Sequence, residues 1–129
     1  MRDYIISPIP DIIREYRQLI NGETKTIFVS NTGYSLVPAL QIYCDDVYKG
    51  KKGFIKKDQI KNLHNVLQIL RRQRTIIVGC DAGLSRSPAV ASAIAYLLGD
   101  YSVRDDIHDK YKFYNKDIYT EIISYGQRK

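Results

Sequence analysis

One short segment of the sequence combines a thiol, an arginine and hydroxyl groups that together could act on a phosphate group. The segment is Cys80-Asp81-Ala82-Gly83-Leu84-Ser85-Arg86-Ser87. A tight turn between a strand and a helix aims backbone N–H groups at one point, and such a point at a helix N-terminus binds phosphate. The same positive field favours a thiolate, so Cys80 is predicted to be a nucleophile. Arg86 is predicted to bind two phosphoryl oxygens with a planar pair of hydrogen bonds.

Apolar periodicity predicts the elements that must position this segment. The run at 75–78, just before Cys80, is continuously apolar, which is typical of a central strand covered on both faces. Asp11 is predicted to be the N-cap of the first helix. The order of elements predicts an α/β protein, a three-layer sandwich with a small central, mostly parallel sheet flanked by helices. Strands are predicted at 4–7, 26–29, 40–44 and 75–78, and helices at 11–20, 57–73, 88–98, 103–113 and 116–125.

Length and composition limit the class of protein. A chain of 129 residues with 44% hydrophobic and 26% charged residues predicts one globular domain over 1–129. The net charge of +6 favours acidic partners such as phosphorylated proteins, nucleic acid or an anionic membrane surface. No apolar run approaches the roughly 18 residues of a membrane-spanning helix. With only two cysteines and no secretory signal at the start, a cytoplasmic protein that does not contact membranes is expected, its oligomeric state undetermined.

The pattern Cys-x5-Arg-Ser resembles the phosphate loop of the protein tyrosine phosphatase superfamily. The longer string with Gly83, Ser85 and Pro88, continuing to Ala95-Tyr96-Leu97-Leu98, is similar to the dual-specificity branch. The resemblance implies a phosphatase-like fold and a two-step hydrolysis through a phosphocysteine intermediate, with no metal or cofactor. It places the substrate phosphate on the loop residues Asp81, Ala82, Gly83, Leu84, Ser85 and Arg86.

The resemblance also implies a general acid, an aspartate on a loop well before the cysteine, which protonates the leaving oxygen. Asp46 fits this place, since Ile42 and Cys44 before it match the strand that leads into the acid; the neighbouring Asp45 is the alternative. In a third interpretation, both acids simply end a strand in solvent.

Ser87 matches the family's hydroxyl, which stabilises the departing sulfur, although a serine there could equally be a helix N-cap. Ser85 also matches the branch, or only shapes the loop. Gly79 departs from the family, in which a histidine precedes the cysteine and supports the loop. Without that histidine the thiolate depends on the loop amides, the helix dipole and Arg86. Slower turnover, or a phosphate-binding protein without activity, is therefore an alternative.

Two further features lie near the predicted acid. Several lysines lie in the segment that follows Asp46. This segment is interpreted either as a mobile lid whose lysines attract acidic substrates or as a solvated loop. Cys44 is expected to be a buried strand residue, with a protective disulfide to Cys80 as the alternative. The lysines are Lys49, Lys51, Lys52, Lys56 and Lys57.

The predicted function is hydrolysis of phosphotyrosine and phosphoserine or phosphothreonine in proteins. The chain has no recognisable extra segment for gripping a phosphotyrosine ring, which favours a shallow pocket and dual specificity. An RNA 5′-phosphatase is a second hypothesis, supported by the net charge, so a nucleic-acid partner is possible but not favoured. Action on phosphoinositides is weaker still, because Asp81 and Leu84 stand where lipid-directed members tend to carry lysines.

Overall fold

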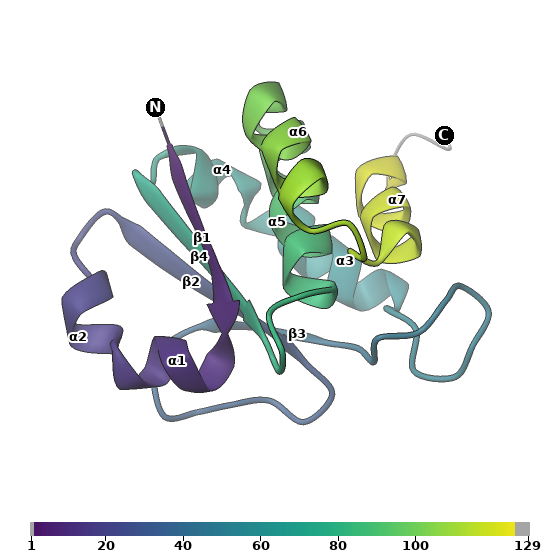
Figure 1. Ribbon diagram of the computed structural model, residues 1–129, viewed down its shortest axis with the longest axis horizontal. Helices are drawn as coiled ribbons and strands as arrows, with labels where there is room; N and C mark the ends of the chain where they lie inside the picture. Colours follow the sequence, from purple (N-terminus) through teal and green to yellow (C-terminus); the bar gives the residue numbers. More distant parts are fainter. Residues whose placement is uncertain (1, 126–129) are drawn as a thin grey trace.

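A sheet of four strands forms the centre of the protein, for which a computed structural model describes residues 2–125 (Figure 1). Each neighbouring pair is parallel, which confirms the predicted α/β class and the small central sheet. The predicted domain of 1–129 also includes positions 1 and 126–129, which lie outside the described residues. The strands are β1 (Asp3–Pro8), β2 (Thr24–Ser30), β3 (Leu40–Tyr43) and β4 (Thr75–Cys80), in the order β1-β4-β2-β3.

Helices flank the sheet on both faces in the part of the chain that the structure describes. They are α1 (Ile9–Arg14), α2 (Tyr16–Leu19), α3 (Lys57–Asn65), α4 (Leu67–Arg71), α5 (Arg86–Leu97), α6 (Tyr101–Lys110) and α7 (Lys116–Ser124). In Figure 1, α1 and α2 lie on one side of the sheet, whereas α3, α5, α6 and α7 lie on the other. The three-layer arrangement predicted from the order of elements is therefore confirmed.

The inner strand β4 is apolar along its length because its successive side chains enter two different cores. Ile77 packs with Ile9 and Ile12 of α1 on one face. Ile76 and Val78 belong to the larger core on the other face, which includes the buried face of α5. Residues in a strand alternate between the two faces of the sheet, so a strand covered on both faces must be apolar throughout.

The helix α5 is buried on nearly every side, as its alanine-rich sequence predicts. Every residue from 86 to 95 is buried, and small side chains allow α5 to pack closely on β4, α6 and α7. It begins at Arg86, two positions before the predicted start, which places Arg86 and Ser87 in its first turn. Among residues 2–125, no helix is both long and apolar enough to cross a bilayer.

The predictions for three helices were wrong in their limits. The helix predicted at 11–20 begins at Ile9 instead, with Pro8 rather than Asp11 as N-cap; Pro10 suits the first turn because its φ is already helical. This helix and the one predicted at 57–73 each consist of two helices, interrupted at Glu15 and Val66. The apolar stripe continues across both breaks, so its periodicity does not reveal them. The helix predicted at 103–113 starts and ends earlier, as α6.

Candidate active site

The segment from Cys80 to Arg86 forms a loop between the end of β4 and the start of α5. Because the loop follows β4, it lies at the carboxyl ends of the parallel strands, and because β4 is an inner strand, it lies between the ends of β1 and β2 (Figure 1). Ligands of open α/β sheets bind at this edge. The strand, loop and helix predicted around Cys80 therefore occupy the place in the fold that suits a binding site.

Gly83 allows the loop to turn tightly against the end of β1. Its φ is +72°, a left-handed backbone conformation that residues other than glycine rarely adopt. A Cβ there would also lie 2.8 Å from the backbone nitrogen of Pro8. Both observations require glycine at this position. The turn in return directs the N–H of Gly83 toward the sulfur of Cys80, at 3.2 Å.

The thiol of Cys80 is enclosed by hydrogen-bonding groups and is only 2% exposed. The backbone N–H groups of Gly83 and Ser87 donate to its Sγ at 3.2 and 3.3 Å. The Oγ of Ser87 is 3.2 Å from the same sulfur. These contacts, together with the N-terminus of α5, stabilise negative charge on sulfur. The sequence predicted a nucleophilic thiolate at this position, and the structure places hydrogen-bond donors around its sulfur.

Ser87 is not the N-cap of α5. The cap position is occupied by Ser85, whose side chain makes no capping hydrogen bond. Ser87 lies in the first turn, fully buried, with its hydroxyl against Cys80. Of its two predicted roles, the hydroxyl beside the sulfur is therefore the one that the geometry supports.

The guanidinium of Arg86 is held by two neighbours. Its Nη1 donates to the backbone carbonyl of Cys44 at 2.9 Å, and its Nη2 donates to Oδ2 of Asp81 at 2.8 Å. Arg86 is 8% exposed; burial lowers the pKa of its guanidinium, but the hydrogen bond to Asp81 and the neighbouring groups outweigh burial and raise it. A bidentate contact to a phosphoryl group at Nη2 therefore requires Asp81 to move aside.

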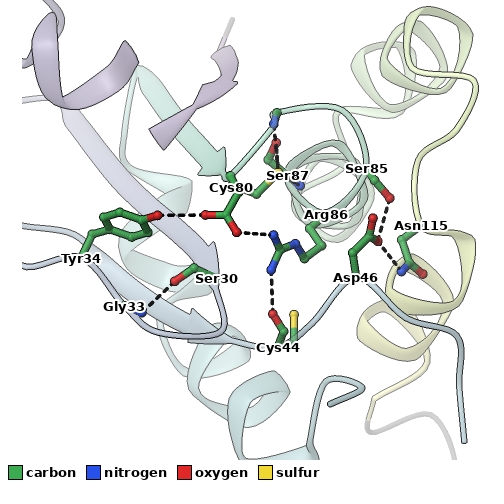
Figure 2. Close-up of polar contacts among 12 residues, drawn as sticks. Ser30, Gly33, Tyr34, Cys44, Asp46, Cys80, Ser85, Arg86, Ser87 and Asn115 are labelled. Atoms are coloured by element: carbon green, nitrogen blue, oxygen red, sulfur yellow. Dashed lines mark hydrogen bonds and ion pairs between the residues drawn. The ribbon is translucent and has the colours of Figure 1, made fainter. Parts of the chain in front are cut away.

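Asp81 lies between Arg86 and a tyrosine that the sequence analysis did not select. Its other carboxylate oxygen, Oδ1, accepts a hydrogen bond of 2.9 Å from the hydroxyl of Tyr34 (Figure 2). The hydrogen bond from Arg86, followed by that from Tyr34, holds the pKa of Asp81 below its ordinary value. The hydrogen bond to Asp81 in turn raises the pKa of Tyr34. Asp81 is thus a carboxylate and Tyr34 a neutral phenol near neutral pH.

Tyr34 is fixed on the loop between β2 and β3 by Gln41 of β3. The Nε2 of Gln41 donates to the carbonyl of Tyr34 at 2.6 Å, and its Oε1 accepts from the N–H of Tyr34 at 3.1 Å. The ring of Tyr34 also meets the edge of Phe28, with centroids 6.3 Å apart. No motif connects Tyr34 with Asp81, since this contact depends on the course of the loop.

The two neighbouring acids point to different surroundings. Asp46 is exposed, and its Oδ1 accepts hydrogen bonds from Oγ of Ser85 at 2.8 Å and from Nδ2 of Asn115 at 2.9 Å. Asp45 instead packs its carboxylate against Gly53. Its backbone N–H also donates to the carbonyl of Gly53. Asp46 is therefore the acid that the structure brings to the phosphate loop.

The remaining loop residues vary in their surroundings. Ala82 and Leu84 are exposed, and Leu84 is 62% exposed. Ser85 carries the hydrogen bond to Asp46, so it links the phosphate loop to the predicted acid rather than only shaping the loop. The sequence analysis missed Asn115 as well. Its place before an apolar helical stretch could have identified it as an N-cap, but not as a contact of Asp46.

The glycine before the cysteine matches the helix α1. A Cβ at Gly79 would lie 2.5 Å from Cδ1 of Ile12 and 3.1 Å from Cγ1 of Ile9, both of which are fully buried. Any larger side chain would have to displace this apolar contact. The departure at Gly79 is therefore explained by close packing of α1 on β4, and the hydrogen bonds to Cys80 come from the loop and α5 instead.

Cys44 is buried at the end of β3, as expected, and both cysteines are free. Burial raises the pKa of Cys44 to about 12, so its side chain is a neutral thiol. Its backbone carbonyl, rather than its sulfur, participates in the site by accepting from Arg86.

Comparisons with known proteins agree with this geometry at the level of the fold. No model of a protein family and no curated protein matches the sequence. The structure is similar to that of the PTP-2 phosphatase of Cydia pomonella, with a TM-score of 0.65 and 18% identity over 95% of this chain and 84% of that chain. It is also similar to Tk-PTP in its active form, with a TM-score of 0.54 and 15% identity over 95% and 90% of the two chains. The fold is therefore the phosphatase-like fold that the resemblance implied.

Proposed function

We propose that the protein is a cysteine-dependent phosphatase that hydrolyses phosphotyrosine and phosphoserine or phosphothreonine in proteins. The observation that carries this proposal is the enclosure of the Cys80 sulfur by the N–H groups of Gly83 and Ser87, with Arg86 in the same loop. A charged thiol, amide donors directed at one point and a guanidinium are the groups that phosphoryl transfer requires. The likeness to two phosphatases named as PTPs supports the same reaction class.

In the first step, the thiolate of Cys80 attacks phosphorus, the S–P bond forms and the P–O bond to the leaving group breaks. Asp46 gives its proton to the leaving oxygen. In the second step, water attacks phosphorus, Asp46 takes a proton from that water, and the S–P bond breaks to release inorganic phosphate. The hydroxyl of Ser87, 3.2 Å from the sulfur, donates to the thiolate as it departs.

Arg86 stabilises the charge on the equatorial phosphoryl oxygens in both steps. Because Asp81 contacts Nη2, binding of the substrate phosphate exchanges one anionic partner of Arg86 for another. Nη1 keeps its hydrogen bond to the carbonyl of Cys44, which orients the guanidinium plane during the exchange. Loop amides and a preoriented arginine stabilise charge without reorganisation at the moment of reaction.

A protein substrate is supported by the exposed apolar side chains on the loops of this edge. Leu84 belongs to the phosphate loop itself, and Tyr48 follows Asp46 with 73% of its surface exposed. Leu36, on the loop of Tyr34, and Phe113, two positions before Asn115, are 79% and 89% exposed. Exposed apolar side chains on the loops around a site are typical of a surface that binds a protein.

Substitution of the nucleophile tests the mechanism. Cys80→Ser should abolish turnover of an aryl phosphate and of phosphopeptides, while its fold, followed by circular dichroism, stays intact. Turnover that survives Cys80→Ser would refute the cysteine-dependent mechanism. Binding of a phosphopeptide by the parent protein without phosphate release would assign it as a binding protein instead.

A comparison of substrates at equal concentration tests the substrate class. Phosphate release should be fastest from peptides that contain phosphotyrosine or phosphothreonine. Preferred release from a 5′-triphosphorylated RNA or from a phosphoinositide would favour the corresponding alternative and contradict the assignment to proteins.

A further inference from the structure

Asn115 is the residue at which three parts of the candidate active site meet. It lies just before α7, and only 8% of its surface is exposed. Its Nδ2 donates to Oδ1 of Asp46 at 2.9 Å (Figure 2). The same Nδ2 donates to the carbonyl of Val47 at 3.1 Å. Its backbone N–H donates to the carbonyl of Ser85 in the phosphate loop at 3.1 Å. Its Oδ1 accepts from the N–H of Ile118 at 3.0 Å and so caps α7.

We propose that Asn115 is a positioning residue that holds Asp46 in place as the general acid. The proposal rests on the phosphatase function proposed above and assigns a residue that acts through Asp46 without touching the substrate. Asp46 needs such a contact because it is exposed and lies on an irregular segment between β3 and α3. Without a fixed partner, an exposed carboxylate would sample several rotamers and face the leaving group only part of the time.

The contacts also determine which oxygen of Asp46 carries the reacting proton. The amide nitrogen of Asn115 is a donor only, and its orientation is fixed because Oδ1 of the same amide accepts from Ile118. The Oδ1 of Asp46 must therefore remain an acceptor, a role that the hydroxyl of Ser85 also supports at 2.8 Å. The proton that passes to the leaving group is consequently held on Oδ2, which is free of these two donors.

The choice of asparagine at this position follows from its double task. Serine, aspartate and asparagine are about equally good N-caps, because a cap needs only an acceptor. Of these three, asparagine alone also carries amide donors. The donor side of Asn115 serves Asp46, and the acceptor side serves α7. A substitution by serine therefore separates the two tasks, since its hydroxyl oxygen keeps the cap while the longer amide donors are removed.

The first turns of α7 also hold the segment that follows Asp46. The N–H of Lys49 donates to Oδ2 of Asp117 at 2.9 Å, and Nζ of Lys49 pairs with Oε1 of Glu121 at 2.6 Å. These contacts position the segment as a whole. Asn115, by contrast, donates directly to the carboxylate of Asp46.

Two substrates and two variants test the proposal. Phenyl phosphate needs the acid because its phenol has a pKa near that of tyrosine, about 10, whereas an aryl phosphate with strongly electron-withdrawing groups releases its leaving group without protonation. Asn115→Ser should lower kcat/KM on phenyl phosphate about tenfold or more, the scale of a misplaced catalytic group. It should leave kcat/KM on the electron-poor substrate nearly unchanged, because kcat/KM covers the reaction only through the first chemical step, in which that leaving group needs no proton. Asn115→Ala should show the same kinetics and in addition unfold at lower urea concentration, because it also loses the cap.

A double variant separates positioning from general damage. Once Asp46→Asn has removed the acid, adding Asn115→Ser should cost no further activity on phenyl phosphate, as expected for two residues that act as a unit. Additive losses, an equal loss on both substrates, or a fully active Asn115→Ser would each overturn the proposal. In those cases the parent enzyme still depends on Cys80. A parent protein that hydrolyses neither substrate would instead refute the proposed function.

Asn62→Asp is the control for effects that any asparagine substitution and protein preparation could have on the kinetics. Asn62 is an exposed residue of α3. Within residues 2–125, its side chain makes no hydrogen bond to Asp46 or to the phosphate loop. Its kinetics on both substrates should equal those of the parent.

Discussion

The two flanks of Cys80 are held by different kinds of interaction. On one flank, Arg86 is paired with Asp81, whose side chain is 48% exposed and whose second oxygen binds Tyr34. On the other flank, Asp46 is held by the neutral groups of Ser85 and Asn115, of which Asn115 is buried. The arginine is thus held by a charge and the acid by neutral donors.

This difference suits the task of each flank. The partner of Arg86 must be replaced by phosphate, and the half-exposed carboxylate of Asp81 can turn out into solvent when phosphate takes its place. Asp46 must keep its place in both steps while its charge changes, and neutral donors hold one oxygen without occupying the other. The comparison predicts that substitutions on the two flanks have different kinetic signatures.

Among substitutions on the two flanks, the largest effect is expected from Arg86→Lys. Lysine cannot make the planar contact, so kcat/KM for an aryl phosphate should fall about 10²–10³-fold, the usual effect of removing one group that stabilises the transition state. Arg17→Lys, on the exposed side of α2, is the matched control and should leave the rate unchanged. A rate for Arg86→Lys close to that of the parent would remove Arg86 from the mechanism.

The next effect concerns the acid flank. Asp46→Asn should lower kcat on phenyl phosphate about 10²-fold, the lower range for loss of a general acid, and should remove the basic limb of the pH–rate profile. Asp45→Asn alters a side chain that packs on Gly53 and should change the rate far less. The opposite ranking of these two variants would transfer the role of acid to Asp45.

The smallest effect is expected on the arginine flank, and it is a gain. Asp81→Asn removes the anion that competes with phosphate for Arg86, so KM should fall and inhibition by inorganic phosphate should tighten, both by about two- to fivefold. The low pKa of Asp81 keeps it charged across the neutral range, so this gain should not vary with pH there. A higher KM in Asp81→Asn would show that Asp81 instead holds Arg86 ready for the substrate.

Much of the fold could be predicted because the apolar patterns are strong. The continuous run before Cys80 predicted a central strand, and β4 is an inner strand of the sheet. The alanine-rich stretch after the loop predicted a buried helix, which is α5. The breaks at Glu15 and Val66 could not be predicted, because a stripe of apolar residues is continuous whether or not one residue leaves the helical conformation.

Of the candidate site, the sequence by itself determined the segment from Cys80 to Ser87, because its residues are neighbours in the chain and their contacts are local. The end of β4, the turn at Gly83 and the first turn of α5 suffice to bring the N–H groups of Gly83 and Ser87 to the sulfur of Cys80. Only the tertiary structure decided the partners from distant elements. Tyr34 contacts Asp81, and Asn115 contacts Asp46. The two residues of each pair are far apart in the sequence, so no local pattern predicts either contact. Their hydrogen bonds depend on where loops end in space, and apolar periodicity carries no information about that.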